Sequence, residues 1–197
     1  MSAPKCGAWL TLGIAAMLSL STAAAAQKTT PAAADTSATQ GWSDANILAH
    51  LATGDSLEVA TARLAQQRTQ NAQIRHFAQT LIKDHSKNQQ QGLALAKTAG
   101  ITPQPAPSDT TPQHVQSEMS RWQSASSPAQ FDRAWLEFQV KHHAEDMAML
   151  PKLQKQAHSE ALKGLIGKTL PVIRKHYDRA LSLQRQSASA GNPGARR

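Results

Sequence analysis

Residues 56–85 read SLEVATARLAQQRTQNAQIRHFAQTLIKDH, and this stretch decides the fold. Strong helix formers dominate it on both sides of Asn71, a residue type that commonly begins a helix. The pattern predicts two helices, over residues 44–69 and 72–99, joined by only two or three residues. Helices with so short a link lie antiparallel. Glu58 and His85 stand 13 and 14 residues either side of Asn71, which places them at the same height within about 1.5 Å.

The second half of the chain repeats this pattern. One helix is predicted over residues 127–157, where Ser127 begins a capping box with proline at the first helical position, and another over 160–186. A proline-rich stretch and a short helix over 114–124 separate the two pairs. Two antiparallel hairpins joined by a long Pro-rich crossover predict an all-α fold, a four-helix bundle with ferritin-like connectivity.

The second pair also places two polar side chains level. His143 and His176 stand 16 and 17 residues either side of Ser159. Apolar residues surround His85, His143 and His176 at helical spacing, and small residues surround Glu58, so all four side chains are expected to be buried. We therefore predict a metal site formed by Glu58, His85, His143 and His176, with one ligand from each helix.

One carboxylate and three imidazoles suit one divalent transition metal ion, such as zinc, iron, manganese, nickel or copper. Carboxylates that support such histidines by hydrogen bonds are predicted to be Asp55, Asp84 and Asp146. His142 is an alternative ligand, since it neighbours His143. A di-iron centre is disfavoured because the chain has no Glu-x-x-His motif. The alternative is a buried polar layer without metal, in which Glu58 bonds to protonated histidines and sets the helix register.

The first 26 residues have the pattern of a secretory signal peptide. Lys5 precedes an apolar stretch over residues 9–20, and small residues continue to Ala26, after which we place the cleavage site. The apolar stretch is shorter than the about 20 residues that span a bilayer as a helix. We therefore predict a periplasmic or secreted protein whose mature chain has no transmembrane anchor.

The mature chain is predicted to have three parts. Residues 27–42, rich in Ala, Thr and Gln, resemble a flexible spacer, and residues 187–197 a disordered basic tail. Residues 43–186 then form the four-helix bundle. Cys6 is the only cysteine and lies in the predicted leader, so the mature chain has no disulfide or thiolate ligand.

The charge of the chain indicates one kind of partner and argues against another. The formal net charge of +8 suits an anionic envelope surface. The basic residues are scattered and do not alternate with aromatic residues, so no nucleic-acid binding is predicted. The sequence contains neither a Gly-x-Ser-x-Gly elbow nor a glycine-rich phosphate loop. We favour a non-enzymatic role over a redox enzyme that uses the same cluster.

Short motifs recur in order along the predicted helices. They are Ser56-Leu57-Glu58-Val59 through Leu64-Ala65, Phe77-Ala78, Asp84-His85-Ser86, Phe131-Asp132, Gln139-Val140-Lys141-His142-His143, and Leu170-Pro171 through His176. Through these motifs, about residues 43–185 resemble an exported bacterial family catalogued as domain of unknown function 4142, in the ferritin-like group. The resemblance implies a secreted or periplasmic bundle with characteristic polar positions at Glu58, Asp84, His85, Asp132, His143 and His176.

The resemblance implies no activity. Trp135 stands where the family usually has tyrosine, and His142 is an additional histidine. Two functions follow from the sequence as a whole. The first is an exported bundle that binds a divalent metal ion through the inward Glu/His cluster. The second is an envelope interaction or stress-protective module whose buried polar layer is structural.

Overall fold

A computed structural model of the chain describes residues 41–190. The predicted signal peptide, the spacer up to residue 40 and the tail from residue 191 lie outside the described residues. Within the described part the chain forms five α-helices and no strand, which confirms the predicted all-α fold. The helices are α1 (Asp44–Arg68), α2 (Ala72–Thr98), α3 (Thr111–Gln123), α4 (Pro128–Gln156) and α5 (Glu160–Ala190).

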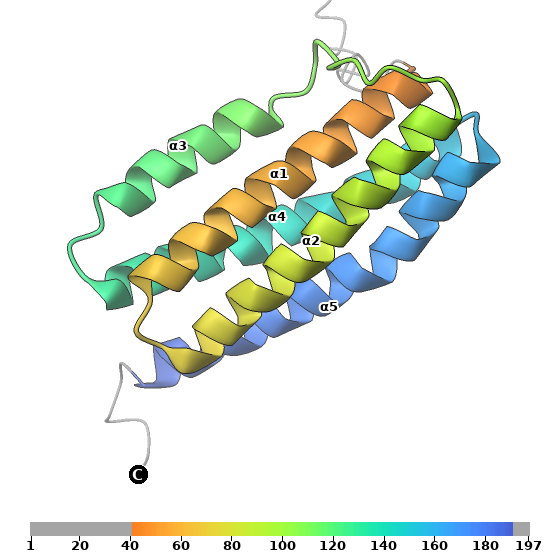
Figure 1. Cartoon of the computed structure of the whole chain (residues 1–197). Helices are drawn as coiled ribbons and strands as arrows, with labels where there is room; N and C mark the ends of the chain where they lie inside the picture. Colours follow the sequence, from red (N-terminus) through yellow and green to blue (C-terminus); the bar gives the residue numbers. More distant parts are fainter. Residues whose placement is uncertain (1–40, 191–197) are drawn as a thin grey trace, which may run out of the picture. The chain divides into compact units, whose positions relative to one another are not determined.

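Four long helices make a bundle from two antiparallel hairpins (Figure 1). The α1–α2 hairpin packs on the α4–α5 hairpin, with α2 beside α5 and α1 beside α4. The connection from α2 to α4 is the predicted long crossover, and its helix α3 packs against both α1 and α4. Among residues 41–190, no helix has the combination of length and apolar character that a membrane span needs.

Side-chain caps begin the helices where the sequence predicted them. The Ser43 hydroxyl accepts a hydrogen bond from the Asn46 backbone N–H, and the Asn46 side chain accepts one from the Ser43 backbone N–H. Asn71 accepts hydrogen bonds from the backbone N–H groups of residues 73 and 74. Ser127 accepts one from Gln130 ahead of α4. These caps satisfy donors that helix starts leave without partners.

Two boundaries differ from the prediction. The helix α5 continues to Ala190, four residues into the segment predicted as disordered tail. Serine and alanine support a helix there, and the helix-breaking Gly191 and Pro193 come only afterwards. Trp42, predicted as part of the flexible spacer, is buried, and its indole Nε1 donates to Ser108 Oγ at 3.1 Å.

His50 makes a further contact between α1 and the crossover. It is buried, and its Nδ1 lies 2.8 Å from Asp109 Oδ2. Its ring meets the Trp42 ring edge-on at a centroid distance of 5.1 Å. Asp109 belongs to the crossover, so His50 and Trp42 together fix the crossover to the start of α1.

The apolar core is divided into two clusters. One includes Phe77, Trp122, Phe131 and Trp135 near the α1–α2 turn. The other includes residues such as Ile47 at the opposite end of the bundle. On each long helix the predicted site residue lies between positions belonging to the two clusters. Polar side chains therefore interrupt the core at one common height.

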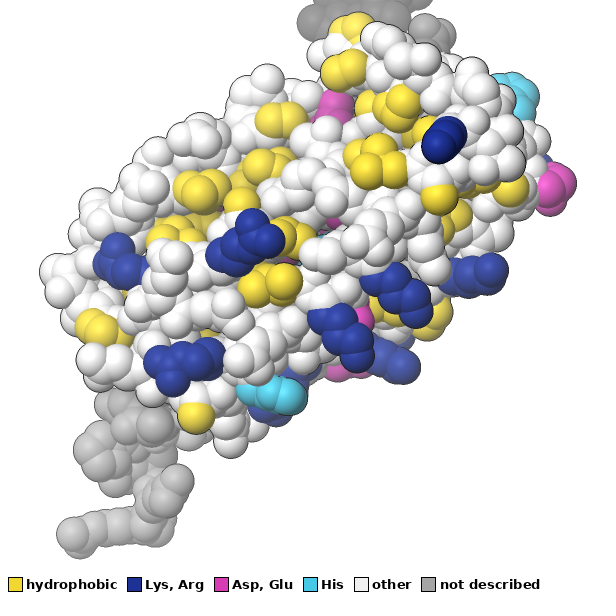
Figure 2. All heavy atoms as spheres, viewed as in Figure 1, with side chains coloured by type: hydrophobic (Ala, Val, Ile, Leu, Met, Phe, Trp, Pro, Cys, Tyr) yellow, Lys and Arg dark blue, Asp and Glu magenta, His cyan; other side chains and the backbone are white. Residues whose placement is uncertain are grey.

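The described surface carries scattered charge. Figure 2 shows the face viewed as in Figure 1, where Lys and Arg side chains stand among uncharged and apolar ones without forming one continuous patch. This distribution agrees with the scattered basic residues of the sequence.

Candidate metal site

A layer of polar side chains crosses the bundle between the two apolar clusters, and we call it the polar layer. Its members are Asp55 and Glu58 of α1, Asp84 and His85 of α2, Gln139, His142, His143 and Asp146 of α4, and His176 of α5. The exposed fraction is 2% for Glu58, 5% for His85, 0% for His143 and 3% for His176. The predicted burial of these four side chains is therefore confirmed.

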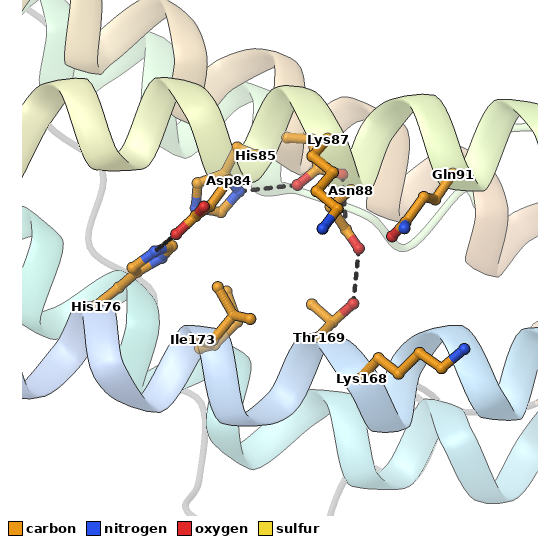
Figure 3. A pocket seen from close by; sticks show the side chains of 11 residues that line it. Asp84, His85, Lys87, Asn88, Gln91, Lys168, Thr169, Ile173 and His176 are labelled. Atoms are coloured by element: carbon orange, nitrogen blue, oxygen red, sulfur yellow. Dashed lines mark hydrogen bonds and ion pairs between the residues drawn. The ribbon is translucent and has the colours of Figure 1, made fainter.

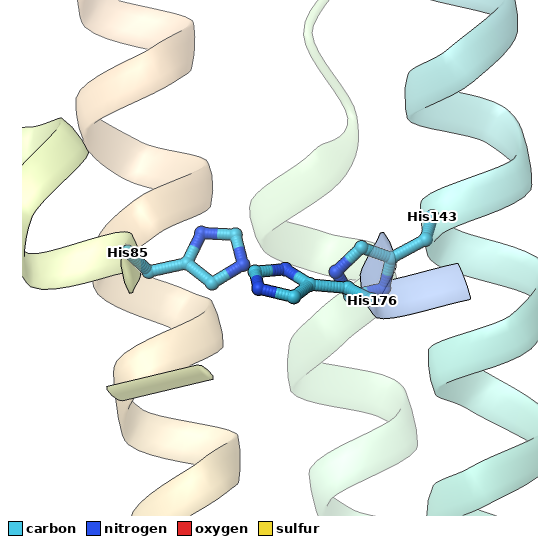
Figure 4. Close-up of side chains that lie close together, drawn as sticks. All are labelled: His85, His143 and His176. Atoms are coloured by element: carbon cyan, nitrogen blue, oxygen red, sulfur yellow. The ribbon is translucent and has the colours of Figure 1, made fainter. Parts of the chain in front are cut away.

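Three histidines from three helices face one another at the centre of the layer (Figure 4). The ring centroids of His85 and His176 lie 5.2 Å apart, those of His143 and His176 5.3 Å, and those of His85 and His143 5.8 Å. One ring nitrogen from each histidine lies within 4.8 Å of the other two. A bound zinc or similar ion requires such nitrogens at about 2 Å.

Each of these histidines is held by one ring nitrogen. His85 Nδ1 lies 2.8 Å from Asp55 Oδ1, His143 Nδ1 lies 2.9 Å from the Gln139 carbonyl oxygen, and His176 Nε2 lies 3.1 Å from Asp84 Oδ2. Because every partner atom is an oxygen acceptor, these nitrogens donate. Histidines that bind metals are commonly held in this way.

The opposite nitrogens of the same rings have no partner. His85 Nε2, His143 Nε2 and His176 Nδ1 are buried without a hydrogen bond among the described residues. Leaving a buried polar atom unsatisfied costs about 1–3 kcal/mol. The three atoms belong to the three rings that converge, so one ion bound among them would satisfy all three.

Glu58 belongs to a second group. Glu58, His142 and His143 each offer a ligand atom within 4.8 Å of the other two. The Glu58 Oε1 atom lies 2.9 Å from His142 Nδ1, and Oε2 accepts a hydrogen bond from Gln139 Nε2 at 3.0 Å. The structure thus divides the four predicted ligands into two groups that share His143. Both adjacent histidines are buried, so His142 lies beside His143 in the layer and does not replace it.

The charges of this second group are arranged as an ion pair. Burial lowers the pKa of His142, but the nearby Asp146 and Glu58 carboxylates outweigh it and raise the pKa to about 9. Burial raises the pKa of Glu58, and the hydrogen bond from His142 with the charges of His143 and His142 brings it well below its usual range. At neutral pH a protonated His142 therefore faces an ionised Glu58.

His143 has the opposite protonation state. Burial, together with the neighbouring His85 and His176, lowers its pKa to about 3 despite the attraction of Glu58. The pKa of His176 is also lowered, mainly by burial and by His85. Burial lowers the pKa of His85 too, but the hydrogen bond to Asp55 and the charge of Glu58 raise it overall. A neutral imidazole is the form that binds a metal, so His143 is already in that form at neutral pH.

The predicted supporting carboxylates take three different positions. Asp55 and Asp84 hydrogen-bond to His85 and His176, whereas Asp146 Oδ2 lies 3.8 Å from His142 Nδ1. Sequence reasoning missed Gln139, whose side chain bonds Glu58 and whose carbonyl holds His143. The signal was its position one turn before His143, on the same face of the helix.

The fold and the layer define a class of protein, a helical bundle with a buried histidine centre. The chain belongs to the family described as Domain of unknown function (DUF4142), whose model matches residues 26–183. A search of the curated proteins found no match. Among solved structures, the chain is similar to "CopM in the Cu(II)-bound form", with 14% sequence identity and a TM-score of 0.58 over 74% of this chain and 98% of that chain. This likeness shows the fold.

Proposed function

We propose that the protein binds one divalent transition metal ion inside the bundle, through His85, His143 and His176. The supporting observation is the convergence of three buried rings, each of which has one nitrogen without a partner and is held by its other nitrogen. Glu58, the fourth predicted ligand, stands next to this centre and shares His143 with it through the second group.

Copper and zinc are the metals to test first. Imidazole ligands suit zinc, copper, iron and nickel, and the nitrogen-only set disfavours magnesium and calcium, which prefer oxygen. The similar solved structure, CopM, is in a Cu(II)-bound form. Cu(II) is therefore the first candidate ion for this chain, and Zn(II) the second.

The proposed role is storage, delivery or structural use of the ion in the cell envelope. Export is supported by the basic, apolar and small-residue pattern of residues 1–26. A place in the ferritin-like group stays a prediction. N-terminal sequencing of the protein from the envelope fraction tests the export, with Gln27 expected as the first residue.

Metal content tests the proposal directly. The tag-free protein, incubated with Cu(II) or Zn(II) and desalted, is expected to retain about one equivalent of ion by elemental analysis. His143→Ala is expected to retain less than about 0.1 equivalent, because it removes the ligand shared by both groups. His76→Ala is the matched control, since His76 is exposed and lies outside the polar layer. Retention below about 0.1 equivalent by the unsubstituted protein would refute metal binding.

A structural polar layer without metal is the second candidate, and one observation favours it. Both carboxylate oxygens of Glu58 already face protein partners, Oε1 with His142 and Oε2 with Gln139. Such an ion pair sets the helix register without any ion. The protein then serves as an envelope interaction or stress-protective module, and a chelator has no effect on its melting temperature.

A further inference from the structure

The two groups of candidate ligands share one residue, His143. His143 Nδ1 donates to the Gln139 carbonyl, so only Nε2 is free to bind an ion. An ion bound among His85, His143 and His176, the inner position, therefore excludes a second ion among Glu58, His142 and His143, the outer position. The two positions are alternatives for one ion, and moving the ion between them replaces two ligands while His143 stays bound.

The outer position is the one nearer a large cavity. A cavity of about 440 Å³ is lined by residues of the crossover, α3 and α4, together with His50. It includes His114, His142, Asp146 and Met149 in its lining. Imidazole, carboxylate and thioether groups are all transition-metal ligands. His142 thus belongs both to this cavity and to the outer position.

A smaller cavity lies beside the large one. Its volume is about 30 Å³, enough for at least one water molecule or ion. It shares His50, Thr111, His142 and Asp146 with the large cavity, and Glu58 and His85 line it further in. Ligand-type side chains therefore lie along the whole way from the α3–α4 side to the centre of the bundle.

We infer that the ion reaches the inner position through the large cavity, and that Glu58, His142 and His143 hold it on the way, with the ion displacing the His142 proton to solvent. This inference rests on the proposed function. Each step keeps one ligand in common, since His142 lines the cavity and His143 belongs to both positions. The adjacent histidine pair of α4 is thus a relay for the ion.

A second cavity lies on the opposite side of the bundle. This cavity, of about 200 Å³, lies between α2 and α5 and is lined by the inner ligands His85 and His176 as well as by the exposed Lys87 and Lys168 (Figure 3). Hydrogen bonds from Asn88 Nδ2 to Asp55 Oδ2 (2.8 Å) and from Thr169 Oγ1 to Asn88 Oδ1 (2.7 Å) join the residues between this cavity and the small one. Two ammonium groups repel a metal ion on this side, against the single ammonium group of Lys141 in the lining of the large cavity.

The test places a bulky tryptophan side chain in one cavity at a time. Thr110 and Gln91 are exposed residues that line the α3–α4 and α2–α5 cavities respectively. Stopped-flow competition between the protein and a chromophoric chelator gives the association and release rates of Cu(II). Thr110→Trp is expected to slow both rates by about fivefold or more with the Kd unchanged, and Gln91→Trp to leave both within about twofold.

Equal slowing of association and release indicates that the substitution obstructs the route of the ion. A barrier on the route does not alter the free energy of the bound state. A loss of affinity without slower release contradicts the inference, since the substitution then acts on the bound ion. The inference is also contradicted if Thr110→Trp slows the uptake of Cu(II) no more than Gln91→Trp does. If the unsubstituted protein takes up no ion at all, the proposed function itself fails.

The outer position has its own test. His142→Gln removes a ligand of that position and leaves His85, His143 and His176 in place. It is expected to keep one Cu(II) per chain and to load about tenfold more slowly. His76→Gln, at an exposed site, is the control. Unchanged loading of a folded His142→Gln protein overturns the relay, and the Thr110→Trp result decides the route if that variant does not fold.

Discussion

At the scale of single residues, His142 and His143 of α4 are held in opposite protonation states. Successive helix residues point about 100° apart, so His142 faces Glu58 and Asp146 while His143 lies between His85 and His176. The pKa of His142 is about 9 and that of His143 about 3. Glu58 therefore balances the charge of His142 and leaves the lone pair of His143 available. The ion pair and the inner metal position do not compete for one histidine.

A second pair, His50 with Asp109, affects the free energy of unfolding at low pH. Burial raises the pKa of Asp109, but the hydrogen bond from His50 outweighs it and lowers the pKa to about 2. A carboxyl group whose pKa is depressed by folding stabilises the native state above its unfolded pKa. That contribution is lost as the pH falls from about 4 to about 2.

Asp109→Asn tests this contribution. At pH 7 the variant is expected to lose about 1 kcal/mol of unfolding free energy, a value reduced for the partial exposure of the pair. The difference from the unsubstituted protein is expected to shrink as the pH falls towards 2, where Asp109 begins to be protonated in the folded state as well. Urea unfolding across this pH range measures it. Asp178→Asn, at an exposed position of α5, is the control. An equal loss in both variants, or a loss that does not change with pH, contradicts this role of His50.

At the scale of elements, α4 carries most of the polar layer, so its start sets the position of several site residues. The Ser127 hydroxyl accepts the Gln130 backbone N–H, and Pro128 occupies the first turn. Ser127→Ala is expected to lower the unfolding free energy by about 1 kcal/mol, because the N–H loses its acceptor. Urea unfolding measures this change. Ser120→Ala is the control, since Ser120 lies inside α3 where alanine is well tolerated. A Ser127→Ala protein as stable as its control excludes a role for this cap.

Sequence reasoning predicted helices from signals that are local to the chain. Asn71, Ser127 and the short links fixed the hairpins, and the caps are found there. The crossover contacts were missed because they join residues distant in sequence, as when Trp42 donates to Ser108. The pairing of His50 with Asp109 is likewise distant in sequence, since the two residues are 59 positions apart.

At the scale of the whole molecule, counting residues from each turn predicted that the four site residues lie at one height along the bundle. It did not predict which of their side chains meet. Height along the axis follows from the rise per residue, and the four side chains do share one layer. Which of them meet depends on the direction of each side chain around its helix and on the packing of one hairpin against the other. Glu58 therefore pairs with His142 of α4, although the count set it opposite His85.

The same layer interrupts the apolar core, so a bound ion should stabilise the whole bundle. An ion that binds only the folded state adds about 2.7 kcal/mol at a free concentration 100 times its Kd. For a bundle of this size, that corresponds to a rise in melting temperature of about 5–10 °C. Calorimetry of the tag-free protein with Cu(II) or Zn(II), against a sample with chelator, measures the shift. His143→Ala is expected to show none, because both positions lose their common ligand. A melting temperature that is the same with ion and with chelator favours the metal-free layer, in which the Glu58–His142 pair and the Gln139 hydrogen bond alone hold the two hairpins in register.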